Sequence, residues 1–485
     1  MSSVLKNNKI VKAWNGLSLA VRTSIAIMIA SFFQSGMKLL FVPVFTRMLT
    51  TTEYGIVTVF ESVQTTLGTI TMLSLHASCY SRGMQEFKED RDLFTSSLLF
   101  LSNVCTIVVG AVFLAMGNWI TIQLKLSAPL LVLMFVCFLF LPAYNFWIAR
   151  QRFEYKYQGM LIVTILINLL SPIFAVILVS NFDGDKGFAK IMGAEIVLLT
   201  VQIILYIRTF SKSHWKIKWD YVKYGFRFNL PLVPHYASQQ ILTSCDRIMI
   251  QSLIDSASAG IYGLSYQVAS VVRIVWTSIN TVLVPWEYDK IEAGKVEDIR
   301  RLTRVLMLCY AAACIGIMFV APEVIHIFAP SSYHEGVYVI PPVIAGVFFS
   351  GMYSLLAILE FYYKKNIYVM VASTLAAVLN VILNFIFIPM FGYQAAAYTT
   401  LACYAVYAFL HAMNLVRLKI AYFYDLKALA MMSVAMIGIC LVVAKTYNGI
   451  LIRYALLLAM LIVVFIKRKM LLEIFLSLKA GKKKK

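Results

Sequence analysis

The sequence predicts an all-α integral membrane protein with about 14 transmembrane helices. Of its 485 residues, 61% are hydrophobic and 14% are charged, whereas soluble domains are about 45–50% apolar and about 25% charged. The apolar residues form continuous runs of the length that a helix needs to cross a bilayer about 30 Å thick. A β-barrel would instead show alternating segments of about ten residues, so the runs are predicted to be helices.

The predicted spans fall into three groups that are separated by basic segments. Six precede the segment 208–224, six follow it, and two lie near the C-terminus. They cover 23–46, 56–80, 93–117, 127–147, 159–180, 188–207, then 225–250, 259–284, 303–328, 337–360, 367–389, 393–416, and finally 427–444 and 449–466. These groups predict an N-lobe at 23–207, a basic cytoplasmic linker at 208–224, a C-lobe at 225–416 and two further spans at 427–466.

The distribution of basic residues predicts the orientation. If the N-terminal segment 1–22 is cytoplasmic, 33 of the 43 Lys and Arg residues lie in cytoplasmic segments and five in outer loops. Such a bias is the positive-inside pattern, so both termini, including the basic tail 467–485, are predicted to be cytoplasmic. The formal charge of +20 is spread over many short clusters rather than one stretch, which argues against a nucleic-acid partner.

Other classes of protein are disfavoured by what the sequence lacks. It has eight cysteines but no CxxC or Cys/His spacing, so no metal site is predicted. It also lacks a P-loop, HExxH and GxSxG, which disfavours ATP-driven or hydrolytic chemistry, and we expect neither an enzyme nor a cofactor.

Basic residues inside the apolar runs are the first candidates for a binding site. A charge in the bilayer costs about 2.5–3.5 kcal/mol or more, and such residues are functional candidates. We expect them to face a polar interior and to attract an anion, although an internal ion pair that only fixes packing is the alternative for Lys38 and Arg273, and extension to the interface is the alternative for the others. The candidates are Lys38, Arg273, Arg247, Arg227 and Arg47.

Acidic and amide side chains at similar depth are candidates for ion coupling and for a polar path. Glu61 and Asp246 are the coupling candidates, because coupling to a proton or sodium gradient needs a buried carboxylate. Glu61 is expected near Lys38, with which it can pair. Asn380 and Asn384, one turn apart, can line a polar path or join helices. Pro231 and Pro234 predict a distorted start of the span 225–250.

Three strings resemble the Wzx-type polysaccharide exporters. The first runs from Phe45 through Arg47 to Gly55. Residues 49–56, which overlap it, align weakly with residues 254–261 of the same chain. The second contains Asp246-Arg247 and continues to Gly260. The third runs from Leu379 to Gly392, with a departure at Gln394-Ala395, where the family has a Gly-Ala step.

The resemblance implies a MATE-like fold of the multidrug/oligosaccharidyl-lipid/polysaccharide exporter superfamily, with two six-helix lobes around a central cavity and two extra helices. It implies a flippase of the inner membrane that moves a polyprenyl-pyrophosphate-linked oligosaccharide outward for O-antigen, capsule or exopolysaccharide synthesis, with membrane lipids and other polysaccharide-assembly proteins as partners. The family also leaves a structural role open for Arg47 and Asp246-Arg247. A small-molecule cation antiporter and a membrane-embedded polysaccharide polymerase or ligase are the alternatives.

Overall fold

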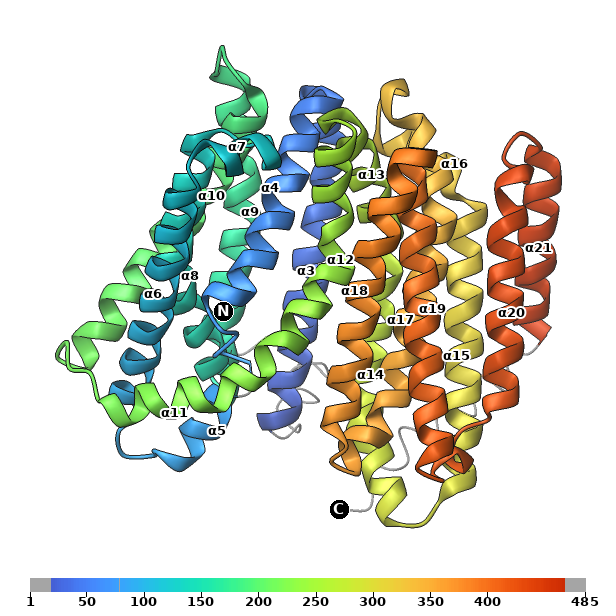
Figure 1. The fold of residues 1–485 in the computed structure, drawn as a ribbon. Coiled ribbons are helices and arrows are strands. Elements are labelled where there is room, and N and C mark those ends of the chain that lie inside the picture. Colours follow the sequence, from blue (N-terminus) through green and yellow to red (C-terminus); the bar gives the residue numbers. More distant parts are fainter. Residues whose placement is uncertain (1–18, 78, 467–485) are drawn as a thin grey trace, which may run out of the picture. The chain divides into compact units, whose positions relative to one another are not determined.

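The computed structural model describes residues 19–77 and 79–466, and the regular elements in these ranges are helices (Figure 1). The predicted all-α class is therefore confirmed. Within the described ranges, eleven helices are long and apolar enough to cross a membrane. The spans predicted at 56–80, 225–250 and 449–466 correspond to helices α4, α12 and α21, which fall short of that criterion, so fourteen spans remain a prediction. The termini 1–18 and 467–485 lie outside the described residues.

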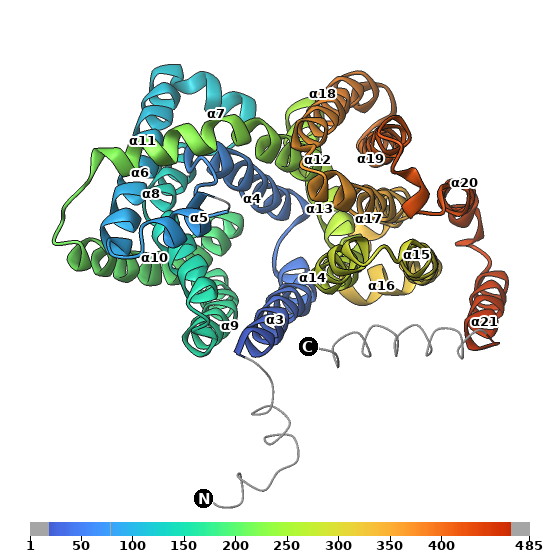
Figure 2. The same cartoon turned by 90° about the horizontal axis from the view of Figure 1, so that it is seen from below.

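Unit 1 comprises residues up to Leu49 and Phe60–Ala237. Helices α3 and α9 pack against each other, and α8 packs against α10 (Figure 2). Each of these helices is apolar along its length, so it can contact neighbouring helices on more than one side. Its elements are α3 (Leu19–Met48), most of α4 (Thr51–Thr71), α5 (Cys79–Glu86), α6 (Arg91–Met116), α7 (Asn118–Leu124), α8 (Ala128–Phe153), α9 (Tyr157–Asn181), α10 (Lys186–Lys212), α11 (Trp219–Asn229) and η1 (Leu230–Leu232).

Unit 2 comprises Thr50–Val59 and the residues from Ser238 onward. Helix α17 is its core element and packs against α14, α15, α19 and α20. Its elements are α12 (Val233–Leu253), α13 (Ser256–Ala269), α14 (Val271–Glu292), α15 (Val296–Phe319), α16 (Ala321–Phe328), η2 (Ser331–Val339), α17 (Ile340–Tyr362), α18 (Asn366–Phe391), α19 (Gln394–Arg417), η3 (Ala421–Phe423), α20 (Leu426–Val443), η4 (Ala444–Thr446) and α21 (Ile450–Ile466).

The segment predicted as a basic linker, 208–224, is well ordered by its contacts within unit 1. That segment is part of unit 1, where it forms the end of α10, a turn and the start of α11. Its turn is anchored, because the backbone N–H of Lys218 donates to Ser97 Oγ on α6 at 3.0 Å. The chain passes into unit 2 within α12, between Ala237 and Ser238.

The first turns of α4 belong to unit 2 because they pack on α13. Thr50 and Glu53 form a capping box that fixes the start of α4, with Thr50 N donating to Glu53 Oε2 at 2.8 Å and Glu53 N donating to Thr50 Oγ1 at 3.2 Å. Tyr54 then donates to Gln267 at 3.2 Å. The two aligned segments, 49–56 and 254–261, each join one helix to the next through a short turn, and Asp255 caps the second helix of the later segment.

The span predicted at 225–250 is interrupted, as its prolines predict. Helix α11 ends at Asn229, η1 contains Pro231, and α12 begins at Val233. Helix α11 crosses the ends of neighbouring helices of unit 1 (Figures 1 and 2) and contacts α5 and α6. The buried Asn229 donates from its side chain to the carbonyl of Leu73, which fixes the end of α11.

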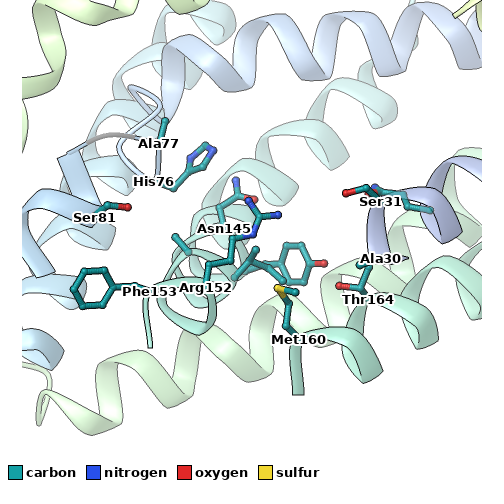
Figure 3. Close-up of a pocket in the computed structure, with 14 residues that line it drawn as sticks. Ala30, Ser31, His76, Ala77, Ser81, Asn145, Arg152, Phe153, Met160 and Thr164 are labelled. Carbon is teal, nitrogen blue, oxygen red and sulfur yellow. The ribbon is translucent and has the colours of Figure 1, made fainter. Parts of the chain in front are cut away.

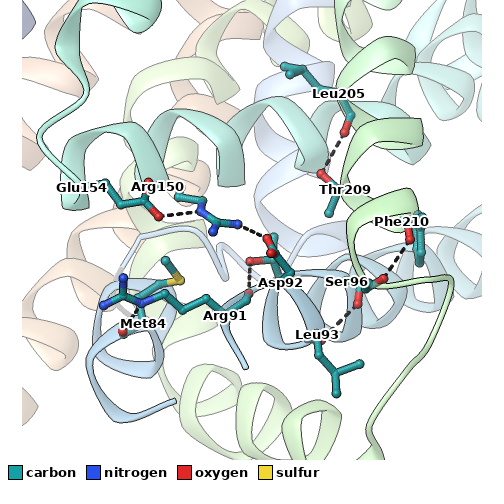
Figure 4. Close-up of polar contacts among 12 residues, drawn as sticks. Met84, Arg91, Asp92, Leu93, Ser96, Arg150, Glu154, Leu205, Thr209 and Phe210 are labelled. Atoms are coloured by element: carbon teal, nitrogen blue, oxygen red, sulfur yellow. Dashed lines mark hydrogen bonds and ion pairs between the residues drawn. The ribbon is translucent and has the colours of Figure 1, made fainter. Parts of the chain in front are cut away.

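An ion-pair cluster holds α6 and α8 together at the same end of unit 1 (Figure 4). Arg150 pairs with Asp92 on α6, and its Nε donates to Glu154 Oε1 at 2.8 Å. Burial alone would raise the pKa of Glu154, but hydrogen bonds from Lys156 and Arg150 outweigh it and hold this pKa below its ordinary value. The Arg150 guanidinium therefore forms ion pairs with two carboxylates.

Candidate functional site

Two of the predicted basic residues meet at one tyrosine in unit 2. Tyr266 on α13 lies between Arg247 on α12 and Arg273 on α14. The guanidinium carbon of Arg247 is 4.6 Å from the centroid of the Tyr266 ring, and Arg273 Nη2 donates to the Tyr266 hydroxyl at 3.2 Å. The ring face attracts the first cation and the hydroxyl oxygen accepts from the second. One side chain thus holds two cations close together.

Neither guanidinium has a carboxylate partner within the described part of the chain. Arg247 donates to the carbonyl of Thr243, one turn earlier on its own helix. The Nε atoms of Arg247 and Arg273 are buried and have no hydrogen-bond partner among the described residues. Two like charges in a low-dielectric site repel each other, and unpaired buried donors cost free energy. An anion bound here would relieve both effects.

Polar aromatic side chains that the sequence reasoning did not single out surround this site. Gln239 on α12 donates to the Tyr407 hydroxyl at 2.9 Å and accepts from the Tyr353 hydroxyl at 3.0 Å. The rings of Tyr353 and Tyr404 are stacked, with centroids 6.4 Å apart. The signal that marks these residues is tyrosines one helical turn apart, Tyr262 with Tyr266 and Tyr404 with Tyr407, within apolar runs.

Asp246 lies in a separate, fully buried hydrogen-bond network. Its carboxylate accepts from Asn384 Nδ2 at 2.7 Å, from the Tyr262 hydroxyl at 2.6 Å and from Thr400 Oγ1 at 2.7 Å. Because consecutive residues of a helix point about 100° apart, Asp246 faces α18 and α19 while Arg247 faces Tyr266. The two motif residues therefore have different hydrogen-bond partners, although Arg247 still acts electrostatically on Asp246.

The two predicted path residues, Asn380 and Asn384, join this network. Both are completely buried on α18. Asn380 donates to Thr400 Oγ1 at 3.0 Å, and Asn384 also donates to Asn380 Oδ1 at 3.3 Å. Their donors are used within the protein, so the structure shows them connecting α18 to α12 and α19.

Glu61 in unit 1 pairs with Lys190 and not with Lys38, which corrects the expected pairing. Lys190 Nζ on α10 lies 2.7 Å from Glu61 Oε1. The reason is packing, since α3 packs along α9 and leaves Lys38 exposed on its surface. A second carboxylate lies nearby in sequence on α10, where Glu195 accepts from Gln64 Nε2 at 3.0 Å.

The remaining predicted basic residues lie in unit 1 and are exposed. Arg47 is in the last turn of α3 and donates to the carbonyl of Pro43 at 2.8 Å. Arg227 lies on α11 and not within a membrane-spanning helix, which corrects its predicted place at the start of a span. The cause is the break at η1, which ends α11 at Asn229 before α12 begins at Val233.

Comparisons with known proteins agree on fold and family. The family described as "Polysaccharide biosynthesis protein" matches residues 20–287. A protein of the Lsg locus of Haemophilus influenzae is 24% identical over 284 residues, which cover 57% of this chain and 69% of that protein. The lipid II flippase MurJ in an inward closed conformation matches with a TM-score of 0.68 at 14% identity, over 93% of this chain and all of MurJ. An inward-facing multidrug resistance transporter of the MATE family matches with a TM-score of 0.54 at 14% identity, over 84% of this chain and 96% of the other.

These findings define a multi-pass membrane protein with a fold like those of MurJ and of MATE transporters. More specifically, the chain belongs to the polysaccharide biosynthesis protein family, whose model matches more than half of it. The resemblance seen in the sequence is thereby confirmed at the level of family and fold.

Proposed function

We propose that this protein is a flippase that moves a polyprenyl-pyrophosphate-linked oligosaccharide from the cytoplasmic to the outer leaflet of the inner membrane by alternating access. The family supports a role in polysaccharide biosynthesis, and the fold is one that flippases use. The product would serve O-antigen, capsule or exopolysaccharide synthesis. The proposed orientation places both termini in the cytoplasm, and contacts with other polysaccharide-assembly proteins belong to the same proposal.

The observation that carries this proposal is the convergence of Arg247 and Arg273 on Tyr266 with no carboxylate partner. A pyrophosphate carries negative charge on several oxygens, and guanidinium groups bind such oxygens with two parallel hydrogen bonds. The unpaired Nε atoms supply suitable donors. A small-molecule cation would be repelled by the same two charges, which disfavours the antiporter alternative at this site.

Coupling to a proton or sodium gradient is assigned in this proposal to Asp246 rather than to Glu61. Asp246 is a buried carboxylate whose hydrogen-bond partners are neutral hydroxyl and amide groups. Arg247 acts on it electrostatically but forms no ion pair with it, so the carboxylate can still take up a proton or a bound cation. Glu61 already has Lys190 as a counter-ion. The proposal therefore assigns ion binding to Asp246 and anion binding to Arg247, which are adjacent residues of α12.

A transport assay in proteoliposomes tests the function. The full-length protein is reconstituted with a fluorescent polyprenyl-pyrophosphate-linked oligosaccharide, and the fraction of glycan that an added glycosidase can reach is followed over time. We expect accessibility to rise faster with protein than in empty vesicles. If a small organic cation is moved and the lipid-linked glycan is not, the antiporter alternative is correct.

A further inference from the structure

Unit 1 contains a polar cavity that neither the predicted site nor the transport proposal uses (Figure 3). It has a volume of about 660 Å³ and lies among α3, the turn before α5, α5 itself, α8 and α9. It is found near the ion-pair cluster of Arg150, at the end of unit 1 that the charge pattern predicts to be cytoplasmic. Its polar lining comes from Ser31, Gln34, His76, Ser81, Asn145 and Arg152.

Arg152 supplies the positive charge of this cavity. Its side chain extends into the space between His76 and Ser81 on one side and Ser31 and Thr164 on the other (Figure 3). None of the 14 lining residues is Asp or Glu. Arg152 also forms no ion pair with a carboxylate elsewhere in the described ranges. The cavity therefore combines a cation with neutral hydrogen-bonding groups and no counter-ion.

Arg150, two residues earlier on α8, shows that carboxylates are available at this level of the unit. It takes both Asp92 and Glu154 as partners. Because residues two apart in a helix point to nearly opposite sides, Arg152 is directed away from that cluster. The unpaired state of Arg152 thus follows from the face on which it lies, and that face opens onto the cavity.

Apolar side chains beside the cavity indicate what kind of anion fits. Ile148 and Phe153 on α8 and Met160 on α9 are apolar and line the cavity together with its polar groups. A ligand with a negatively charged head and hydrocarbon chains could place its head beside Arg152 and its chains along these residues. Basic pockets between membrane helices on the cytoplasmic side bind lipid phosphates in this way.

We propose that this cavity is a binding site for the phosphate ester of a lipid headgroup, with Arg152 as its anion ligand. Asn145 and Gln34 donate hydrogen bonds to phosphate or glycan oxygens, and the apolar lining residues Ile148, Phe153 and Met160 receive the start of the chains. A phospholipid and a polyprenyl-phosphate substrate both carry a phosphate ester that this cavity would bind. The assignment of the cavity therefore does not depend on which lipid the protein transports.

Binding to the purified full-length protein in a neutral detergent tests the proposal. The probes are dioleoyl phosphatidic acid, polyprenyl pyrophosphate, dioleoylglycerol and inorganic pyrophosphate, each measured by native mass spectrometry. We expect the two phosphorylated lipids to bind about tenfold or more tightly than dioleoylglycerol or pyrophosphate, since a charge-assisted contact and the chains both contribute. The phosphorylated lipid that binds more tightly identifies which class of lipid supplies the headgroup phosphate.

Variants separate this site from general charge effects. Arg152→Gln should weaken binding of dioleoyl phosphatidic acid about tenfold or more, and binding of polyprenyl pyrophosphate by less, because Arg247 and Arg273 form the proposed transport site for that lipid. Ser31→Phe, which fills the cavity from an exposed position and keeps the charge, should weaken binding of dioleoyl phosphatidic acid as well. Arg208→Gln, which removes an exposed charge from α10 outside the cavity, should bind like the wild type.

Equal lipid binding by the wild type and by folded Arg152→Gln and Ser31→Phe variants would overturn the proposal, and so would equal affinity for dioleoylglycerol or for free pyrophosphate. Loss of transport in the proteoliposome assay with lipid binding retained would instead contradict only the transport function.

Discussion

Gly55 on α4 and Gly260 on α13 are packed directly against each other in unit 2. A Cβ atom on Gly55 would lie 1.7 Å from the carbonyl oxygen of Ser256 and 3.1 Å from the nitrogen of Gly260, and a Cβ on Gly260 would lie 2.2 Å from the carbonyl oxygen of Thr51. The obstacles are backbone atoms, which cannot move aside as a side chain can. The two segments that resemble each other in sequence are therefore in contact through the residue that they share.

This contact predicts that Gly260→Ala destabilises the protein by about 1–3 kcal/mol, the usual cost of forcing extra atoms into a packed site. The measurement is thermal unfolding in detergent, followed by intrinsic tryptophan fluorescence. Gly438→Ala is the matched control, because a Cβ there meets no atom within 4 Å and alanine is the better helix former. Equal unfolding temperatures for the two variants would show that α4 and α13 do not pack as described.

For the basic site, we predict that Arg273→Ala lowers the rate of lipid-linked oligosaccharide transport about tenfold to a hundredfold, because it removes charge-assisted contacts worth about 1.5–3 kcal/mol. Arg273→Lys should keep part of the activity, since it retains the charge and loses the planar fork. The control is Lys295→Ala, which removes an exposed charge from unit 2. Full transport by Arg273→Ala at wild-type membrane levels would exclude Arg273 from the mechanism.

Asp246→Asn is predicted to abolish the stimulation of transport by an imposed proton or sodium gradient, because the amide keeps the size of the side chain and removes its charge. Transport is measured in proteoliposomes with each gradient imposed separately. Glu61→Gln is the comparison, and we expect it to retain the ion response. A full ion response in Asp246→Asn would transfer the coupling role to another residue.

Acid should weaken the start of α20. Asp425 lies outside the spans and caps α20, where hydrogen bonding to the backbone N–H of Ala428, with help from Arg304, holds the pKa of Asp425 below its ordinary value. A pKa that is lower in the folded than in the unfolded state gives stability above the unfolded value of 3.8, and this stability is lost as pH falls below it.

The test is to compare unfolding temperatures of Asp425→Asn and the wild type between pH 7 and pH 3. We expect the wild type to be the more stable at pH 7 and the difference to shrink as pH falls through the range below about 4. A difference that stays constant with pH would mean that the charge of Asp425 makes no contribution.

The helices were predictable because a run of about 20 apolar residues has few alternatives to a membrane-spanning helix. The run at 225–250 was the exception, because it is not a single helix. The end of the polar helix α11 lies in its first residues, and counting apolar residues does not detect the break that follows. Pro231 and Pro234 carried that information, because proline interrupts the backbone hydrogen bonds of a helix. The all-α class thus followed from composition, and the exact helix ends did not.

The candidate site was predictable in its residue types and not in its pairings. The cost of burying a charge singled out Arg247, Arg273, Glu61 and Asp246 from the sequence alone. Which partner each one meets depends on which helices pack together. Lys190 on α10 pairs with Glu61 for that reason. Tyr266 has no charge to mark it in an apolar run, and only its spacing of one turn from Tyr262 pointed to it.

The most direct test of the central claim compares two substrates with the same glycan and the same polyprenyl chain, one joined by pyrophosphate and the other by a neutral glycosidic bond. The protein is reconstituted in proteoliposomes, and transbilayer movement of each lipid is measured by glycosidase access. We expect the pyrophosphate-linked lipid to move and the neutral lipid to move no faster than in empty vesicles. Equal rates for the two lipids would contradict a role for Arg247 and Arg273 in binding an anionic headgroup.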